Sequence, residues 1–136
     1  MRFQYFEIRP CVEHDGETRS FLGAAEWHEG IGDKVHTPAG ALAEAEQFRR
    51  RHSVEAPVFW TLYGRDEDGL AMAVGDFTSF EDALEVMNAI LAPLAAARDT
   101  AWDAANDRGA DTYHPLRCIA NDLDDFINQC SNGERL

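Results

Sequence analysis

The chain has 136 residues, 45% of them hydrophobic and 27% charged, which fits one globular domain with a single core. Its 25 acidic and 12 basic residues give a net charge of −13. That balance leaves no basic face for direct nucleic-acid binding or for an anionic membrane, so we expect neither partner. The excess of acidic over basic residues is concentrated in residues 66–136, which hold fifteen acidic and four basic residues.

Cysteine usage and the first residues of the chain indicate the compartment. Cys11, Cys118 and Cys130 are odd in number and form no CxxC pair, which favours reduced thiols over a disulfide framework. The opening MRFQYFEIRP lacks the apolar run of a signal peptide, and the longest apolar stretch, residues 86–97, is too short to span a bilayer. We therefore expect a cytoplasmic protein that is not attached to a membrane.

Two strands are predicted at the start of the chain. Residues 3–12 have strand character that Pro10 bends or ends, and HDGE at residues 14–17 is typical of a hairpin turn. Residues 18–28 are predicted as the second strand, although FLGAAEWHE also fits a helical turn. Residues 30–36 are predicted as a loop.

A helix is predicted to run from Pro38 to about residue 52. Thr37 and Pro38 suit its N-cap and its first position. The basic cluster Arg49-Arg50-Arg51 ends this helix, where cations complement the helix dipole. We therefore interpret the cluster as structural and not as a phosphate site.

The strongest pattern is a β-hairpin that feeds a helix, over residues 57–92. Residues 58–63 are β-branched and aromatic, and RDEDG at residues 65–69 has the composition of a turn before the chain returns over residues 70–77. With a five-residue loop, the bulky side chains share one face: Val58, Trp60, Leu62, Leu70, Met72 and Val74. The other face then carries Phe59, Thr61, Tyr63, Ala71, Ala73 and Gly75. A four-residue loop would mix the two sets.

The helix after the hairpin has clear start signals. Thr78 or Ser79 caps it, with acidic residues at the spacing of a capping box, and it runs to about residue 91. Pro93 breaks or kinks this helix, or starts a second one that reaches residue 108 and is closed by Gly109.

A last helix is predicted from Pro115 or Asn121 to about residue 130. Its buried side chains are expected to be Leu116, Ile119, Leu123, Phe126 and Ile127. The element order is thus ββαββα with one or two further helices. We predict a single α+β domain over residues 1–136, with an antiparallel sheet of about four strands and three to four helices packed on it.

The sequence contains no motif for catalysis, metal binding or cofactor binding. The five histidines form no HxxxH, HExxH or HxH pattern, and the glycines form no phosphate loop. A GxSxG nucleophile elbow is also missing. We assign no catalytic residue, no metal and no cofactor, while a metal site made from His14, His28, His36 and the cysteines stays open.

The hairpin face with the smaller side chains is the first candidate binding surface. Phe59, Thr61, Tyr63, Ala71 and Ala73 combine two aromatic anchors with a floor of small residues. An uncovered sheet face should be polar, so an apolar one usually marks an interface. We expect a helix from residues 93–130, a second subunit in a homodimer, another protein partner or a ligand to cover it.

An acidic row is the second candidate surface. Asp99, Asp103 and Asp107 recur every four residues, so a helix places them about 6 Å apart on one face. Such a row imitates phosphates and suits a DNA-binding protein. The alternative is a solvated face that aids solubility.

Residues 58–91 carry a resemblance to a known group. The signatures are Trp60-Thr61-Leu62-Tyr63-Gly64 and Gly75-Asp76-Phe77. In these the chain resembles small uncharacterised proteins encoded on proteobacterial plasmids and integrative elements. The resemblance implies an accessory role in a mobile element, and it implies no activity and no catalytic residue.

Three functions fit these observations. The first is a non-catalytic cytoplasmic interaction or accessory protein that self-associates or binds a protein partner. The second is an acidic mimic of nucleic acid that blocks a DNA-binding enzyme. The third is a small-molecule-binding domain or an enzyme without a known motif.

Overall fold

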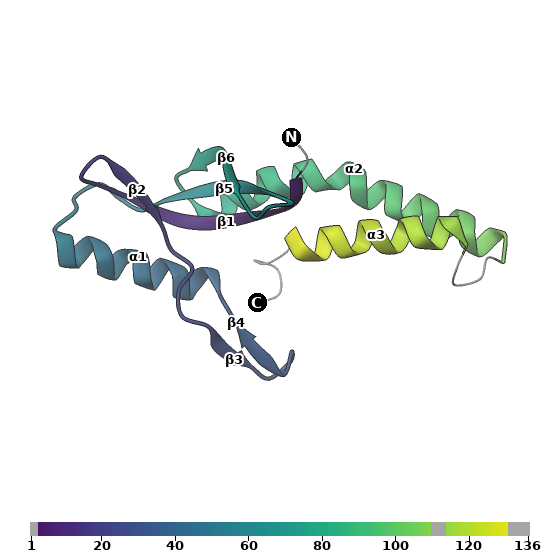
Figure 1. The fold of residues 1–136 in the computed structure, drawn as a ribbon, viewed down its shortest axis with the longest axis horizontal. Coiled ribbons are helices and arrows are strands. Elements are labelled where there is room, and N and C mark those ends of the chain that lie inside the picture. Colours follow the sequence, from purple (N-terminus) through teal and green to yellow (C-terminus); the bar gives the residue numbers. More distant parts are fainter. Residues whose placement is uncertain (1–2, 110–113, 131–136) are drawn as a thin grey trace.

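The computed structural model describes residues 3–109 and 114–130. Its elements are β1 (Phe3–His14), β2 (Glu17–Ser20), β3 (Glu26–His28), β4 (Asp33–Val35), α1 (Pro38–His52), β5 (Phe59–Asp66), β6 (Ala71–Phe77), α2 (Phe80–Asp107) and α3 (Pro115–Cys130). They form a four-stranded antiparallel sheet in the order β2-β1-β5-β6, a separate sheet of β3 and β4, and three helices (Figure 1). The predicted α+β class is confirmed.

All three helices pack on one face of the four-stranded sheet. Side chains alternate along a strand, and the even-numbered residues of β1 and β5 point toward the helices. The larger core cluster joins these strands to α2 and α3: Phe6, Ile8, Trp60, Leu62, Ala83, Met87, Leu91 and Cys130. The smaller cluster joins β1 to α1: Val12, Phe21, Ala45 and Phe48. Figure 1 shows α1 and α3 below β1.

The end of α3 closes part of the outer edge of β1. Strand β2 pairs only with Cys11 to His14 of β1, so the first half of β1 has no strand on that side within the described residues. There the backbone N–H of Phe6 donates to the buried Sγ of Cys130 (3.1 Å). Burial raises the pKa of the Cys130 thiol, which therefore stays protonated and apolar in the core.

The β5–β6 hairpin is antiparallel, and its register changes at a bulge. Next to the turn, Arg65 lies opposite Ala71, as the five-residue loop predicts. The extra residue of the bulge is Val74, so that Leu62 lies opposite Gly75 further along. The prediction that Gly75 shares a face with Tyr63 is therefore wrong. Met72 and Val74 were predicted to share a face with Trp60 and Leu62, but their side chains are exposed, whereas those of Trp60 and Leu62 are buried.

Helix α2 is continuous from Phe80 to Asp107 and contains Pro93. The prediction that the helix breaks at Pro93 is therefore wrong. Packing on both sides of the proline holds the helix together, since Leu91 is buried on the sheet and Ala101 and Ala105 are buried further along α2. The N-terminus of α2 is as predicted, because the N-cap Ser79 accepts a hydrogen bond from the backbone N–H of Asp82 (3.1 Å).

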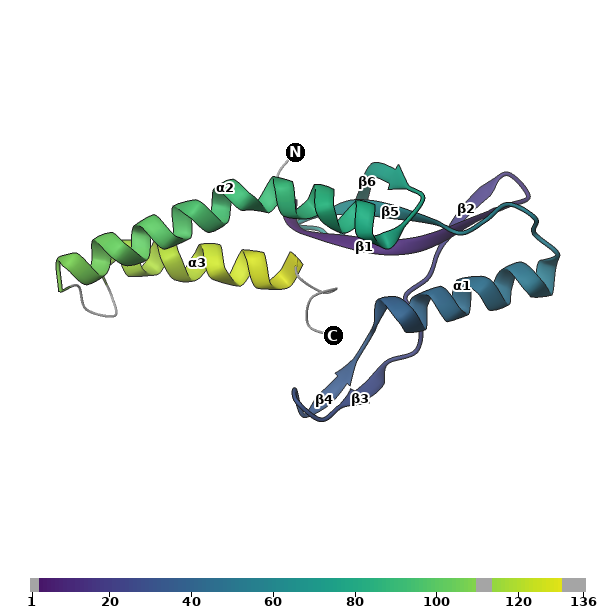
Figure 2. The same cartoon turned by 180° about the vertical axis from the view of Figure 1, so that it is seen from behind.

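The segment between β1 and α1 differs from its prediction. Strand β2 ends at Ser20, and the chain leaves the sheet at Phe21. The prediction of a single strand over residues 18–28 is therefore wrong. Strands β3 and β4 form a short hairpin where residues 30–36 were expected to be a loop. Figure 2 shows that this hairpin stands clear of the sheet. Trp27 of β3 is exposed.

Helices α2 and α3 form an arm that extends beyond the sheet (Figure 1). Helix α3 begins at Pro115, the earlier of its two predicted starts. It buries Ala120 and Cys130, whereas the predicted burial of Ile119 is wrong because that side chain is half exposed. Within the described residues, no helix is both long enough and apolar enough to cross a membrane.

A glycine fixes how the chain approaches α1, and this gives a matched stability test. Gly23 has φ of +76°, and a Cβ built there would lie 2.7 Å from the backbone N of Ala41. Gly32 also has positive φ (+73°), but a Cβ there would meet nothing. We expect Gly32→Ala to lower the free energy of unfolding by about 1–2 kcal/mol through backbone strain alone. Gly23→Ala should cost about 3 kcal/mol or more in urea denaturation, because α1 must also shift. If the two variants lose the same free energy of unfolding, the close approach of Gly23 to α1 is contradicted.

Candidate functional site

One face of the four-stranded sheet has no helix on it within the described residues. It carries the odd-numbered residues of β1 from Glu7 to Glu13 and of β5 from Phe59 to Arg65, with Ala71, Ala73 and Asp76 of β6, and we call it the open face. Helices α2 and α3 pack on the opposite face. The expectation that a helix from residues 93–130 covers the predicted binding residues is therefore wrong.

The structure brings the predicted binding residues together on the open face. Tyr63 lies opposite Ala73 across the hairpin. The side chains of Ala71 and Ala73 are both exposed. Phe59 and Tyr63 are half-buried. Thr61 is only 2% exposed, because it lies between larger side chains and donates a hydrogen bond to Asp76 (2.7 Å).

Charged residues from β1 complete the open face, and the sequence analysis missed them. Glu7 lies opposite Tyr63, and Arg9 lies opposite Thr61. The carboxylate of Glu7 accepts from Arg9 (3.1 Å) and from Arg65 (2.6 Å). The alternation of apolar and charged residues in FEIR, residues 6–9, indicates that Glu7 and Arg9 share one face of a strand. It does not indicate that this strand pairs with β5.

The Glu7 carboxylate is the electrostatic centre of the open face. Its side chain is 12% exposed, and its two oxygens are shared between two guanidinium groups. Arg65 also donates to the carbonyl oxygen of Gly69 (2.8 Å), which ties the hairpin turn to the network. Removing one partner of such a shielded pair leaves an uncompensated charge, so these residues specify the geometry of the face.

A tyrosine and a cysteine form a second polar contact there. The hydroxyl of Tyr63 lies 3.4 Å from Sγ of Cys11, which is wholly buried. Burial and this contact raise the pKa of Tyr63 to about 12. A phenol with that pKa stays protonated at neutral pH and does not act as a base there.

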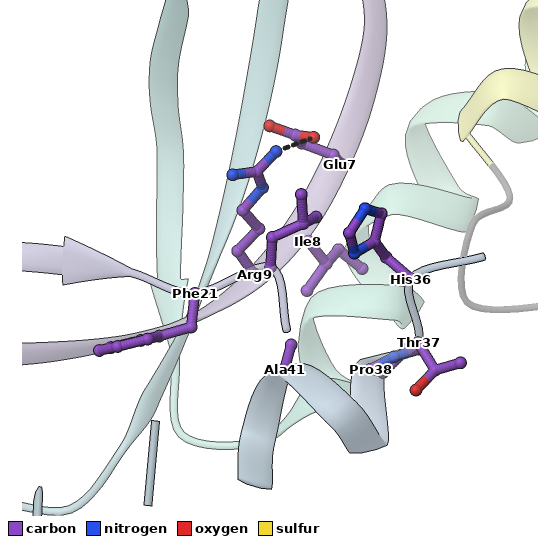
Figure 3. A pocket seen from close by; sticks show the side chains of 9 residues that line it. Glu7, Ile8, Arg9, Phe21, His36, Thr37, Pro38 and Ala41 are labelled. Carbon is purple, nitrogen blue, oxygen red and sulfur yellow. Dashed lines mark hydrogen bonds and ion pairs between the residues drawn. The ribbon is translucent and has the colours of Figure 1, made fainter. Parts of the chain in front are cut away.

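A small cavity lies at the edge of β1. Its volume is about 30 Å³, and Figure 3 shows the Glu7–Arg9 ion pair with Ile8 and His36 around it. Nε of Arg9 lines this region, and it is buried without a hydrogen-bond partner within the described residues. The volume holds one or two water molecules and no metabolite, so we interpret the cavity as a hydration site.

The histidines do not assemble a metal centre among the described residues. No group of three His, Cys, Asp or Glu side chains comes together there. His14 and His52 do approach each other, with ring centroids 4.9 Å apart beside Phe48, a pair that the sequence did not reveal. No disulfide joins the described cysteines, of which Cys11 and Cys130 are buried and Cys118 is exposed.

The acidic row is exposed on the arm formed by α2 and α3. Asp99, Asp103 and Asp107 all lie on the solvent side of α2. Arg98 bridges the two helices by bonding Asp124 of α3 (3.0 Å), and it also donates to Asp99 (3.2 Å). One carboxylate of the row is thus partly neutralised.

Comparison with known proteins gives no match. No protein-family model matches the chain, and it matches neither a curated protein nor a solved structure. The function must therefore be inferred from the geometry of the molecule itself.

The Tyr63–Cys11 contact has a spectroscopic signature. The chain has three tyrosines, so a titration of tyrosinate absorbance should resolve one that ionises near pH 12 and is lost in Tyr63→Phe. Between the ordinary phenol pKa of about 10 and this raised value, the folded state holds the proton that the unfolded state loses, so stability falls as pH rises. Tyr63→Phe should flatten that fall. If Tyr63→Phe still shows a tyrosine that ionises near pH 12, the raised pKa does not belong to Tyr63 and its burial is contradicted.

Proposed function

We propose that the protein is a non-catalytic cytoplasmic accessory protein that binds a protein partner, or a second copy of itself, through the open face. The observation that carries this proposal is the asymmetry of the sheet. One face is buried under three helices, whereas the other has no cover within the described residues. An uncovered face with aromatic side chains is typical of an interaction surface.

The composition of the open face suits a protein partner. Phe59 and Tyr63 are aromatic, and aromatic residues and arginines are enriched at the centres of protein interfaces. Ala71 and Ala73 leave room beside them for a partner's side chains. The face carries three acidic residues and two arginines, so it is close to neutral on a chain with net charge −13. An acidic partner approaching here meets less repulsion than at the acidic surfaces of the chain.

The titratable groups of the open face favour binding over catalysis. Glu7 is shared between two arginines, and the hydroxyl of Tyr63 contacts the buried Cys11. An active nucleophile needs both access to substrate and a neighbouring base, and Cys11 has no access. An enzymatic or small-molecule-binding function is therefore less well supported.

The resemblance to proteins of plasmids and integrative elements supports an accessory role in such an element. Three residues of its signatures, Thr61, Tyr63 and Asp76, lie on the open face.

The acidic row supports a second candidate, a mimic of nucleic acid. Asp99, Asp103 and Asp107 are exposed in line on the projecting arm, while Arg98 is turned toward α3. Displacement of a captured partner by duplex DNA would favour this function. Binding that is unaffected by DNA would favour the open face.

The test of the proposed function compares two variants that each add one negative charge. Phe59→Asp changes the open face, and Ala43→Asp changes an exposed position of α1. We expect partners captured from host lysate by the wild-type chain to be lost with Phe59→Asp and kept with Ala43→Asp. Loss of an aromatic anchor should weaken a purified partner's affinity by about thirtyfold or more. Circular dichroism of both variants should match the wild type, and equal capture by both would refute the role of the open face.

A further inference from the structure

The two edges of the four-stranded sheet differ in how they are protected. Strand β2 forms one edge, has four residues and carries Glu17 and Arg19. Strand β6 forms the other edge, has seven residues and begins with five uncharged ones, AMAVG. Short length and charge keep an edge from pairing with another chain. The first five residues of β6 lack charge, and only the bulge at Val74 and Asp76 at the far end interrupt this edge.

The backbone of β6 presents unpaired groups to the outside. On β1, the N–H of Phe6 points away from β5, because it donates to Cys130. Phe6 lies opposite Gly64, so Gly64 directs its backbone groups toward β6 and pairs with Met72. Ala71 and Ala73 therefore direct their N–H and C=O groups outward. Within the described residues no strand pairs with that side of β6.

Three large apolar side chains lie along the same edge. Leu70, Met72 and Val74 are 67%, 45% and 46% exposed, and they occupy alternate positions. Leu70 and Met72 therefore share one side of the extended chain, whereas Val74 is the extra residue of the bulge, where the alternation is interrupted. Ala71 and Ala73 are on the other side, where they belong to the open face.

We propose that β6 pairs antiparallel with β6 of a second copy of the chain, about a two-fold axis at Met72. Ala71 then exchanges hydrogen bonds with Ala73 of the second copy, which uses the outward groups of both strands. Met72 lies opposite Met72, and Leu70 lies opposite Val74. The pairing extends the sheet to eight strands and makes the two open faces continuous. The inference rests on the proposed function of the chain as an interaction protein.

The register favours a second copy over another partner. Residues 70–75 carry no carboxylate, so two copies of this stretch can lie side by side. In this one register Met72 of each copy meets Met72 of the other, while Asp68 approaches Asp76 of the other copy, a like-charge contact that limits the affinity. The bulge at Val74 keeps the ladder short, so the interface is small and micromolar affinity is expected.

Disulfide trapping tests the register. In a non-hydrogen-bonded antiparallel pair the Cα atoms lie about 4.5 Å apart, within the range of a disulfide. In a Cys118→Ser background, which removes the exposed thiol, Met72→Cys should form a cross-linked dimer under mild oxidation. Leu70→Cys and Val74→Cys are the controls, because each faces a different residue across the axis and should cross-link at least tenfold more slowly. Equal trapping at all three positions would overturn the register.

A backbone variant tests the pairing itself. Ala73→Pro removes an outward N–H that the monomer does not use, and proline is tolerated on an edge strand. In sedimentation experiments from about 1 to 100 µM, it should weaken the dimer by about tenfold or more with unchanged helical content. A wild-type chain that stays monomeric throughout would overturn the inference. Partner capture that depends on Phe59 would then still support the proposed function, whereas a trapped dimer with Phe59-independent capture would support the inference alone.

Discussion

The pairing of β1 with β5 determines which side of the sheet is buried. Ile8 lies opposite Leu62, so both project to the same face, and there they meet the Met87 side of α2. Leu62 and Met87 are completely buried, and burial of one such side chain stabilises the fold by about 1.5–3 kcal/mol. A shift of one residue in this register would turn Glu7 toward the helices and Ile8 toward solvent. The helix-covered face and the open face are therefore set by the same pairing.

The open face is ordered by contacts among its own polar groups. Glu7 is held by two arginines, and Thr61 is bonded to Asp76. These contacts satisfy the Glu7 carboxylate and the Thr61 hydroxyl without a partner, so this part of the face is ordered before anything binds to it. A rigid, nearly neutral surface loses little conformational entropy on association, which favours a binding role. At the β6 edge no strand pairs with the outward backbone groups of Ala71 and Ala73 within the described residues, and the proposed second copy would supply one.

The hairpin and the helix after it could be predicted because their signals are local. The turn before Gly69 and the cap at Ser79 each depend on a few neighbouring residues, and both are confirmed. The break expected at Pro93 is wrong because tertiary packing on either side outweighs one missing hydrogen bond. The bulge at Val74 was not predicted, although a glycine inside a strand, here Gly75, often marks one, and it changes which residues share the open face. The role of Glu7 was missed because strand order is decided by contacts across more than fifty residues.

Amide hydrogen exchange at two protein concentrations tests the central claim most directly, that one side of β6 is open in the monomer and filled by a second copy. The amides of Ala71 and Ala73 point outward, whereas that of Met72 is bonded to Gly64 within the chain. The account predicts that the two alanine amides exchange rapidly in dilute solution and become protected as concentration rises through the micromolar range. The Met72 amide should be protected at both concentrations. Alanine amides with the same exchange rate at every concentration would contradict the account.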